Sequence, residues 1–140
     1  MKVLFTAEAK AVGGRNGHSE ASDKSVSVDL SIPKAMGGPG KPNTTTPEHL
    51  FAVGYAACFG SALDYVASQK KIAIPGASVT SRVSIGTRPD GGFQLAVVLE
   101  VGLPGHEKAA ADALVAAAHQ VCPYSHATRN NIEVTLTTVV

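Results

Sequence analysis

The stretch Thr46–Lys71, TPEHLFAVGYAACFGSALDYVASQKK, decides the fold, because it reads as one long and almost uncharged helix. Thr46 is a good N-cap residue, Pro47 suits the first helical position, and Glu48 places a negative charge in the first turn. Between that turn and the closing lysines, Asp64 is the one charged residue. A helix that is apolar all round is buried all round. We therefore expect this segment at the centre of the molecule.

Two features argue against a membrane protein or an exported one. A membrane span needs about 20 strongly apolar residues, whereas the helical stretch is rich in glycine, alanine and serine. The first ten residues, MKVLFTAEAK, lack the apolar run of a signal peptide. We expect a cytoplasmic protein with no membrane partner.

Size and charge further limit the class of protein to which the chain can belong. A chain of 140 residues is one domain by size, so we expect a single domain over residues 1–140. The net charge is +1 and the twelve basic residues are scattered, whereas a nucleic-acid-binding domain shows a basic patch. Aromatic residues make up 5% of the chain, too few for a base-stacking platform. The sequence predicts no nucleic-acid partner.

The segment before the long helix predicts an antiparallel sheet. Residues 2–10 alternate between two faces, as a strand does. The stretch GGRNG (13–17) holds an Asn-Gly pair, which is a strong hairpin signal, and we expect further strands over 18–22 and 26–30. Residues 31–46 are rich in proline and glycine and are typical of a long loop.

The segment after the long helix predicts a second hairpin and a second helix. The elements expected there are, in order, a strand over 77–87, a strand over 93–103, a helix over 106–121, a short helical turn over 124–131 and a strand over 132–139. Pro123 ends the second helix, because proline cannot continue the hydrogen-bond ladder. The fold class is therefore α+β, with helices packed on antiparallel sheet.

The two cysteines fall on the two long helices. Helical spacing places Cys58 on one face with Phe51, Tyr55 and Tyr65. A free cysteine in such surroundings is commonly a small, inert core residue. In a reducing compartment, however, two cysteines are more typical of catalysis or redox sensing than of a static disulfide.

Cys122 lies near the end of the second helix. It shares the expected inward stripe with Leu114, Ala118 and Val121. Since both cysteines lie on buried faces, they can meet in the fold if their α-carbons come within about 7 Å.

A buried thiol needs a cation before it can act as a nucleophile. At a pKa of about 8.5 few free thiols are ionised at neutral pH, and apolar burial lowers that fraction. Cys58 lies about three turns inside its helix, beyond the reach of the helix dipole. The cation must come from another element, and the candidates are the lysines and the arginines at positions 15, 82, 88 and 129.

Arg15 stands out among these cations because glycines surround it and let its backbone bend toward a partner. A buried arginine needs an acid, and Glu48 is the obvious one. The plain alternatives are a solvated Arg15 on a hairpin turn and a Glu48 that serves the helix dipole alone.

The spacing of Glu48 and Cys58 raises a geometric difficulty. They are ten residues apart, roughly 15 Å along an unbroken helix, so one guanidinium cannot readily touch both. Either the helix bends or breaks near Gly54, or the acid and the thiol of one site come from different chains. The second option makes the protein a homodimer with composite sites.

Several motifs together resemble a known family. They are PEHLFAVGYAACF (47–59), VCPYS (121–125), which sets Cys122 64 positions after Cys58, GGRNG (13–17), ASQKK (67–71) and NIEVTL (131–136). In this order they are similar to the organic hydroperoxide resistance (Ohr) branch of the OsmC/Ohr family, over nearly the whole chain. The resemblance implies antiparallel sheets wrapped around two central buried helices in an intertwined homodimer.

The resemblance also implies a thiol peroxidase that reduces organic hydroperoxides, including fatty-acid hydroperoxides, to alcohols as a defence against oxidative stress. Carried over by position, Cys58 is the peroxidatic cysteine and Cys122 the resolving one, while Arg15 holds the thiolate and Glu48 orients Arg15. No bound cofactor is implied, and the reductant is an external dithiol, dihydrolipoamide or a lipoylated protein.

Reduction of organic hydroperoxides requires an apolar substrate pocket. We expect Phe51, Tyr55, Tyr65 and the loop residue Met36 to form it. Such a pocket would prefer organic hydroperoxides to hydrogen peroxide.

Two other classes compete with the enzyme. His119, Cys122 and His126 have ligand-like spacing, but Pro123 interrupts the helix and a fourth ligand would have to come from afar, so we expect no metal site. The other class is an apolar-ligand carrier or a structural protein with a static disulfide.

Overall fold

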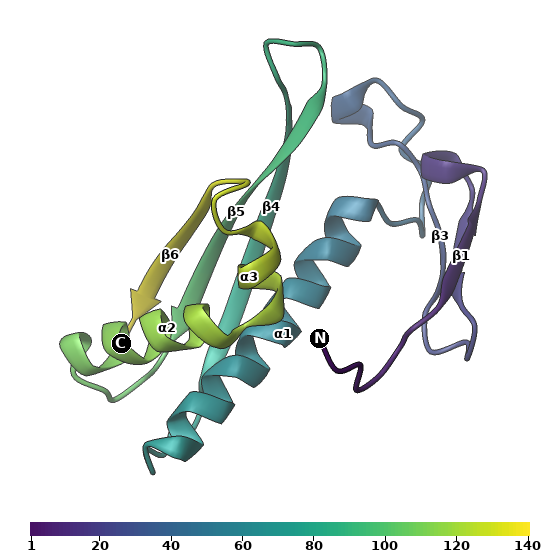
Figure 1. The fold of residues 1–140 in the computed structure, drawn as a ribbon. Helices are drawn as coiled ribbons and strands as arrows, with labels where there is room; N and C mark the ends of the chain where they lie inside the picture. The colour runs from purple at the N-terminus through teal and green to yellow at the C-terminus, as the bar shows by residue number, and fades with distance from the viewer. The chain divides into compact units, whose positions relative to one another are not determined.

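A computed structural model describes all of residues 1–140 and divides the chain into two compact units, residues 1–50 and 51–140. Each unit has its own three-stranded sheet (Figure 1). The division falls inside helix α1 (Pro47–Gln69), where the sequence shows no linker. The mixture of helices and strands confirms the predicted α+β class.

The first unit is built on a small antiparallel sheet in the order β1-β2-β3. Its strands are β1 (Ala9–Val12), β2 (His18–Ala21) and β3 (Ser27–Asp29), and the one-turn 3-10 helix η1 (Gly14–Asn16) joins the first two. The predicted hairpin at GGRNG and the two strands that follow it are confirmed.

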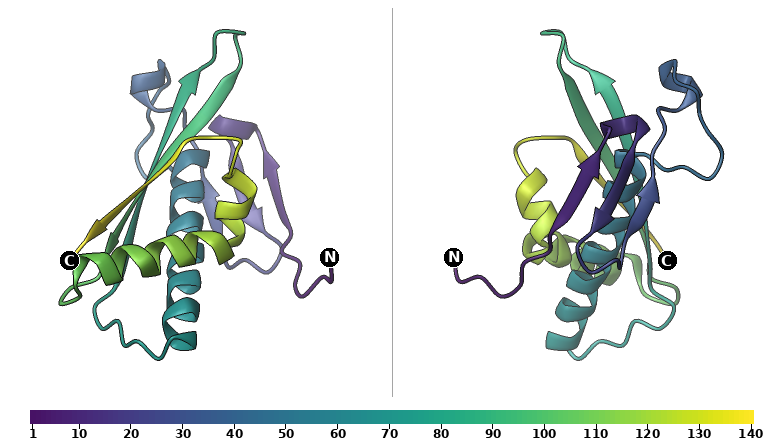
Figure 2. Two further views of the ribbon diagram at one scale, coloured as in Figure 1. Left: turned by 60° about the vertical axis from the view of Figure 1, so that its left-hand side comes forward. Right: turned by 90° about the vertical axis from the view of Figure 1, so that its right-hand side faces the viewer.

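The predicted strand over residues 2–10 is wrong in its first part. Pairing in the ladder begins at Ala9, which lies opposite Ala21, and residues 1–8 belong to no strand. In Figure 2 this segment runs away from the small sheet. Alternating residues form a strand only where a neighbouring strand shares their backbone hydrogen bonds. Here the N–H of Ser22 donates to the carbonyl of Glu8 at 2.9 Å, and residues 1–7 have no partner strand in this unit.

The loop over residues 31–46 returns to the sheet from which it starts. It contains the 3-10 helix η2 (Lys34–Met36) and closes through a bridge between Leu30 and Thr45. The N–H of Thr45 donates to the carbonyl of Asp29 at 2.9 Å. The end of the loop, and with it the start of α1, is therefore fixed to β3.

The second unit is built on a sheet in the order β4-β5-β6. β4 (Ser78–Thr87) and β5 (Phe93–Gly102) form the predicted antiparallel hairpin, whereas β6 (Val134–Val139) pairs with β5 in parallel. The all-antiparallel prediction is therefore wrong for the last strand. Two helices connect β5 to β6 and carry the chain back, so β6 runs in the same direction as β5.

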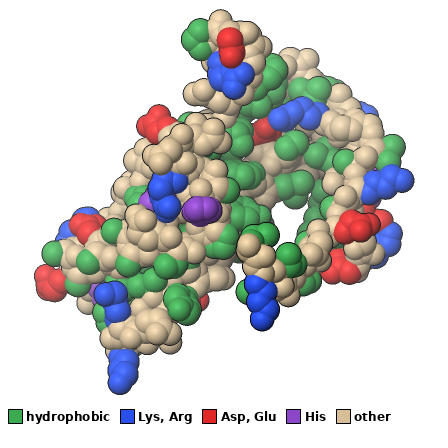
Figure 3. All heavy atoms as spheres, viewed as in Figure 1, with side chains coloured by type: hydrophobic (Ala, Val, Ile, Leu, Met, Phe, Trp, Pro, Cys, Tyr) green, Lys and Arg blue, Asp and Glu red, His purple; other side chains and the backbone are tan.

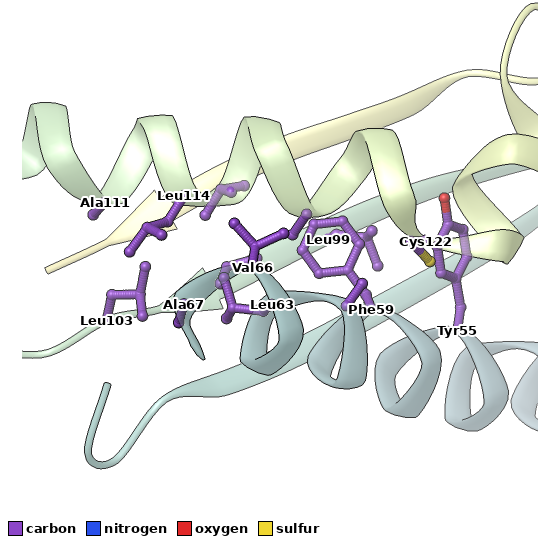
Figure 4. Packing of buried hydrophobic residues seen from close by; sticks show 14 of the residues in the cluster. Tyr55, Phe59, Leu63, Val66, Ala67, Leu99, Leu103, Ala111, Leu114 and Cys122 are labelled. Carbon is purple, nitrogen blue, oxygen red and sulfur yellow. The ribbon is translucent and has the colours of Figure 1, made fainter. Parts of the chain in front are cut away.

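Helices α1 and α2 (Lys108–Val121) cover the buried face of this sheet, and the short α3 (Pro123–Thr128) follows α2 (Figures 1 and 2). Val97, Leu99 and Val101 of β5 are buried under them, as the alternation predicts, whereas Phe93 at the start of the strand is exposed. Figure 4 shows the side chains of α1 pointing toward α2 and β5. The largest fully buried side chains are Tyr55, Phe59, Leu63, Val97, Leu99, Val101, Leu103 and Leu114.

Helix α1 is not buried on all sides, contrary to the sequence prediction. Tyr55, Phe59 and Leu63 lie on its buried face, but Val53 is 70% exposed and Tyr65 is 59% exposed. One chain therefore covers one side of an apolar helix. By length and composition alone α1 would also pass as a membrane span, with a mean hydropathy of 1.4, a test that the core helix of a soluble protein passes as well.

The inward stripe of α2 differs from the prediction at one residue. Leu114, Ala118 and Cys122 are buried as expected, but Val121 is 47% exposed. The stripe instead includes Ala111 and Val115, because buried positions on this helix recur at intervals of three and four.

Charged side chains of both signs are interspersed on the face shown in Figure 3, and no large patch of one sign forms there. Several of them pair locally, such as Arg82 with Glu100 and Arg88 with Asp90. This distribution agrees with the scattered charges of the sequence.

Replacing Leu99 tests the central position of β5 in the core. Leu99 is fully buried, so Leu99→Ala leaves a cavity and should lower the free energy of unfolding by about 2–5 kcal/mol. Urea unfolding followed by circular dichroism measures the loss. Gln94→Ala, at an exposed position of the same strand, is the control and should change stability little. A Leu99→Ala protein as stable as wild type would contradict this description of the core.

Candidate active site

The two cysteine sulfurs lie side by side in the second unit. Cys58 Sγ and Cys122 Sγ are 3.6 Å apart and both thiols are free. Cys122 is fully buried, whereas Cys58 is half-buried. A disulfide requires sulfurs about 2.05 Å apart, so a movement of roughly 1.5 Å would join the two.

The backbone that holds the two sulfurs differs in its geometry. Cys58 lies in the middle of α1, which is unbroken from Pro47 to Gln69. Cys122 lies between α2 and α3 with non-helical backbone angles, φ −64° and ψ 122°. Pro123 causes this break, because its ring ends the ladder of α2 and its fixed φ suits the first residue of α3. Cys58 therefore lies within a long helix, and Cys122 lies at the break between two helices.

The surroundings of Cys58 favour the protonated thiol. Burial raises the pKa of Cys58, the backbone N–H of Tyr124 acts in the opposite direction, and the neighbouring Cys122 thiol raises the pKa further. The N–H of Tyr124 is a group that the sequence analysis missed. Pro123 indicates this group in the sequence, because a new helix begins there and the first residues of a helix have backbone N–H groups that are free to donate.

The three arginines of the second unit have partners other than Cys58. Arg82 pairs with Glu100 at 3.3 Å, and Arg88 pairs with Asp90 at 3.0 Å. Nη2 of Arg129 donates to the carbonyl of His119 at 2.6 Å. None of these three guanidinium groups is bonded to the thiol of Cys58.

Arg15 and Glu48 form a two-pronged ion pair in the first unit. Nη1 of Arg15 donates to Oε2 of Glu48 at 2.9 Å, and Nη2 donates to Oε1 at 2.6 Å. Hydrogen bonding to Arg15 holds the pKa of Glu48 below its usual range, and the same bonds raise the pKa of Arg15. The predicted pairing of these two residues is therefore present in the structure.

Local backbone geometry explains the position of both partners. Arg15 lies in η1 directly after Gly13 and Gly14, whose φ angles of 78° and 56° are rarely adopted by other residues. At the other partner, Thr46 caps α1, because its Oγ1 accepts the N–H of His49 at 3.2 Å. The cap fixes the first turn of the helix, and this turn carries Glu48.

The continuity of α1 narrows the geometric alternatives that the sequence left open. The break near Gly54 does not occur, since the helix is regular over its whole length. Glu48 and Cys58 are then about 15 Å apart along the helix axis. No bend of the helix therefore brings Glu48 close to Cys58 of the same chain.

An apolar cavity of about 300 Å³ lies in the second unit beside α3. Its lining residues are Phe51, Leu95, Tyr124, Ala127, Thr128, Asn131 and Ile132. The rings of Phe51 and Tyr124 stack with centroids 5.9 Å apart. Of the predicted pocket residues, Phe51 lines this cavity, and Tyr124 is an aromatic that the sequence analysis missed.

The other predicted pocket residues lie elsewhere. Tyr55 is fully buried behind this cavity, with its ring edge-on to Phe51. Tyr65 is on the exposed side of α1 and Met36, 41% exposed, is on η2 in the first unit. Neither Tyr65 nor Met36 lines the cavity of the second unit.

The ligand-like triplet around Cys122 does not assemble. The structure has no group of three or more His, Cys, Asp or Glu side chains arranged to hold a metal ion. The ring of His119 packs 6.5 Å from that of Phe59, and burial lowers the pKa of His119, with the charge of Arg129 acting in the same direction. His126 is exposed.

Comparison with known proteins places this geometry in context. Residues 38–137 match the sequence model of a family described as OsmC-like protein. An organic hydroperoxide resistance protein from Xanthomonas axonopodis pv. citri is 53% identical over 137 residues, which cover 97% of this chain and 95% of that protein. The organic hydroperoxide resistance protein OhrB of Bacillus subtilis is 44% identical over 137 residues, with 96% and 97% covered.

Solved structures agree with these relatives. The crystal structure of an organic hydroperoxide resistance protein from Legionella pneumophila has a TM-score of 0.94 at 49% identity, and the match covers 99% of this chain and 100% of that one.

The ion pair predicts a specific pH dependence of stability. Because the folded protein holds the pKa of Glu48 below its ordinary value of about 4.3, the pair stabilises the fold above that pH. This contribution is lost as the pH falls through the lower, folded value. At pH 7, Glu48→Gln should cost about 1 kcal/mol or less, since the pair is partly exposed.

Urea unfolding of wild type and Glu48→Gln at pH 7, 5.5 and 4 measures this difference, which should shrink at the lowest pH. Glu107→Gln, at an exposed glutamate without an ion-pair partner, is the matched control. A difference that grows on acidification would show that the sign of the linkage is wrong.

Proposed function

Because the chain belongs to the OsmC/Ohr family of organic hydroperoxide resistance proteins, we propose that it detoxifies organic hydroperoxides as a two-cysteine thiol peroxidase. Its close match to solved members confirms the predicted OsmC/Ohr-like fold. The observation that carries the proposal is the 3.6 Å distance between the sulfurs of Cys58 and Cys122. This distance suits two thiols that alternate between free and bonded states.

In the first step the thiolate of Cys58 attacks the outer oxygen of the hydroperoxide. The O–O bond breaks, the sulfur is oxidised to a sulfenic acid, and the remaining oxygen leaves as an alcohol after taking up a proton. Cys58 is the better nucleophile of the pair because it is half-buried and reachable, whereas Cys122 is fully enclosed.

Ionisation of Cys58 is the requirement on which this step depends. The N–H of Tyr124 favours the thiolate, but burial opposes it, so a full positive charge is needed as well. Arg15 supplies that charge and donates to the oxygens of the peroxide, while Glu48 orients the guanidinium through its two hydrogen bonds.

The guanidinium of Arg15 and the thiol of Cys58 that form one site belong to two different chains. The first turn of α1 carries Glu48, Cys58 lies about three turns further into the helix, and the helix between them is unbroken. The exposed apolar side of α1, with Val53 and Tyr65, is the kind of surface that a second copy covers. Each site of the homodimer therefore combines Cys58 and Cys122 of one chain with Arg15 and Glu48 of the other.

In the second step Cys122 attacks the sulfenic sulfur of Cys58. A disulfide forms and water leaves, which protects Cys58 from further oxidation. A dithiol then reduces the disulfide, and a dihydrolipoyl group, free or on a lipoylated protein, fits a cytoplasmic enzyme of this family.

Substrate preference follows from the apolar cavity beside Phe51 and Tyr124. Its volume of about 300 Å³ suits an alkyl or aryl group and offers hydrogen peroxide no apolar contact. Tyr55 supports the cavity from behind. Tyr65 and Met36 would join the substrate pocket in the assembled dimer.

Replacing each cysteine separates the two steps. Cys58→Ser should abolish reduction of tert-butyl hydroperoxide, because no sulfenic acid can form. Cys122→Ser should reduce one equivalent and then stop. A coupled assay with lipoamide and its dehydrogenase measures turnover, and peroxide consumed per chain measures the single event.

Wild-type turnover in the Cys58→Ser protein would rule out the thiol mechanism. A structural protein with a static disulfide gives a different result: its disulfide would persist in dihydrolipoamide and would show no peroxide-dependent cycling.

Mixed dimers test the two-chain site. Arg15→Ala and Cys58→Ser homodimers should both have little activity. After the two are unfolded together and refolded, a mixed dimer has one site with an intact Cys58 and an intact Arg15 from the partner chain. We expect activity to return, at one intact site of two, in the coupled lipoamide assay.

A mixture that stays as inactive as its parents would show that both residues of a site belong to one chain. Refolded wild type and refolded single variants are the controls for losses during the procedure.

A further inference from the structure

A buried network of hydroxyl groups joins α1 to α3. Oη of Tyr55 lies 3.0 Å from Oγ of Ser125 and 3.1 Å from Oγ1 of Thr128, and all three side chains are buried. The cysteine chemistry described above makes no use of this network.

The donors and acceptors of the network can be assigned. The hydroxyl of Thr128 donates its proton to a backbone carbonyl, that of Tyr124 at 2.9 Å or that of Ser125 at 3.2 Å. It must then accept from Tyr55, whose single proton is used there. Ser125 therefore donates to Tyr55. The bonds therefore run in one direction, from Ser125 to Tyr55, from Tyr55 to Thr128 and from Thr128 to a backbone carbonyl.

The network lies next to the thiol pair in both helices. Tyr55 precedes Cys58 by three residues in α1, and Ser125 follows Cys122 by three residues. The contact between α1 and the start of α3 thus contains two bridges, sulfur to sulfur at 3.6 Å and hydroxyl to hydroxyl at 3.0 Å. Figure 4 shows Tyr55 and Cys122 adjacent at this end of α1.

Other contacts between α1 and α3 are less directional. The ring of Tyr124 packs against Phe51 and Tyr55 with centroids 5.9 Å and 5.7 Å apart, and such contacts tolerate sliding. Cys122 lies at the break between α2 and α3, whereas Cys58 lies within the unbroken α1. The hydroxyl bonds tie α3, which begins directly after Cys122, to the helix that carries Cys58.

We propose that Tyr55 is a positioning residue that holds the resolving thiol of Cys122 within reach of oxidised Cys58. This proposal rests on the two-cysteine function given above. The sulfenic acid of Cys58 has two fates. Attack by the Cys122 sulfur forms the disulfide and releases water, whereas a second hydroperoxide adds an oxygen to give the sulfinic acid and releases an alcohol. Tyr55 favours the first fate by keeping the sulfurs close.

The variant Tyr55→Phe removes the hydroxyl and keeps the ring contacts with Phe51 and Tyr124. Both hydrogen bonds of the Tyr55 hydroxyl are lost and the Ser125 hydroxyl is left without its acceptor, so disulfide formation should slow by about tenfold. Oxidation of Cys58 to the sulfenic acid should change much less. At high cumene hydroperoxide a larger fraction of Cys58 should become sulfinic acid.

Rapid-mixing kinetics with one equivalent of cumene hydroperoxide separates the two rates, and intact-protein mass spectrometry measures the sulfinic fraction. Ser125→Ala removes the bond between Ser125 and Tyr55 alone, so it should shift the partition in the same direction and by no more than Tyr55→Phe does. The double variant Tyr55→Phe with Ser125→Ala should be no worse than Tyr55→Phe, because that change already removes both bonds of the Tyr55 hydroxyl. Ser61→Ala is the control, since it removes an exposed hydroxyl of α1 that bonds only within the helix.

The outcomes distinguish this proposal from the function on which it rests. If wild type forms no disulfide with hydroperoxide, the proposed function fails. If wild type forms it and Tyr55→Phe partitions like wild type, the positioning role fails. Equal slowing of both steps in Tyr55→Phe, together with a lower melting temperature, would also overturn the role, because it would show a general loss of structure.

Discussion

A thiol enclosed by apolar side chains keeps its proton, and the rest of this structure can be understood from that constraint. Burial raises the pKa of Cys58, and the second thiol beside it raises the pKa further. Cys58 lies too deep in α1 for the helix dipole to act on it. Within the second unit, the backbone N–H of Tyr124 is the group that lowers the pKa of Cys58. A thiol in this position becomes reactive when a positive charge is brought to it.

The fold provides such a charge in Arg15, whose side chain is already oriented by its neighbours. The glycines before Arg15 allow a backbone turn that other residues rarely adopt, and Glu48 fixes the guanidinium with two hydrogen bonds. Glu48 is itself fixed, because Thr46 caps the helix turn that carries it. An oriented guanidinium loses less freedom when it meets an anion than a solvated one does. In our proposal this arrangement serves the thiol of a second chain, so assembly and reactivity depend on each other.

The second cysteine shows how a helix break can serve chemistry. Proline after Cys122 ends α2 and starts α3, and three results follow from this one residue. Cys122 leaves the regular helix, the N–H of Tyr124 becomes free to approach Cys58, and α3 places Ser125 and Thr128 against Tyr55. One sulfur is therefore held within a long unbroken helix and the other at the break between two helices.

The sequence by itself determined the local structure and the chemical types. Caps, alternation and turn residues predicted the hairpins and helices of both units, and the cost of an unpaired charge made Glu48 the expected partner of an inward-facing Arg15. Tertiary structure alone decided the features that depend on distant partners. Residues 1–7 lack a partner strand in their unit, β6 runs parallel because two helices return the chain, and α1 is covered on one side by its own chain. The N–H of Tyr124 near Cys58 and the hydroxyl network of Tyr55 also belong to this group. Hydrogen bonds between residues 66 to 73 positions apart leave no periodic signal in a single sequence, because each residue type involved is equally suited to solvent.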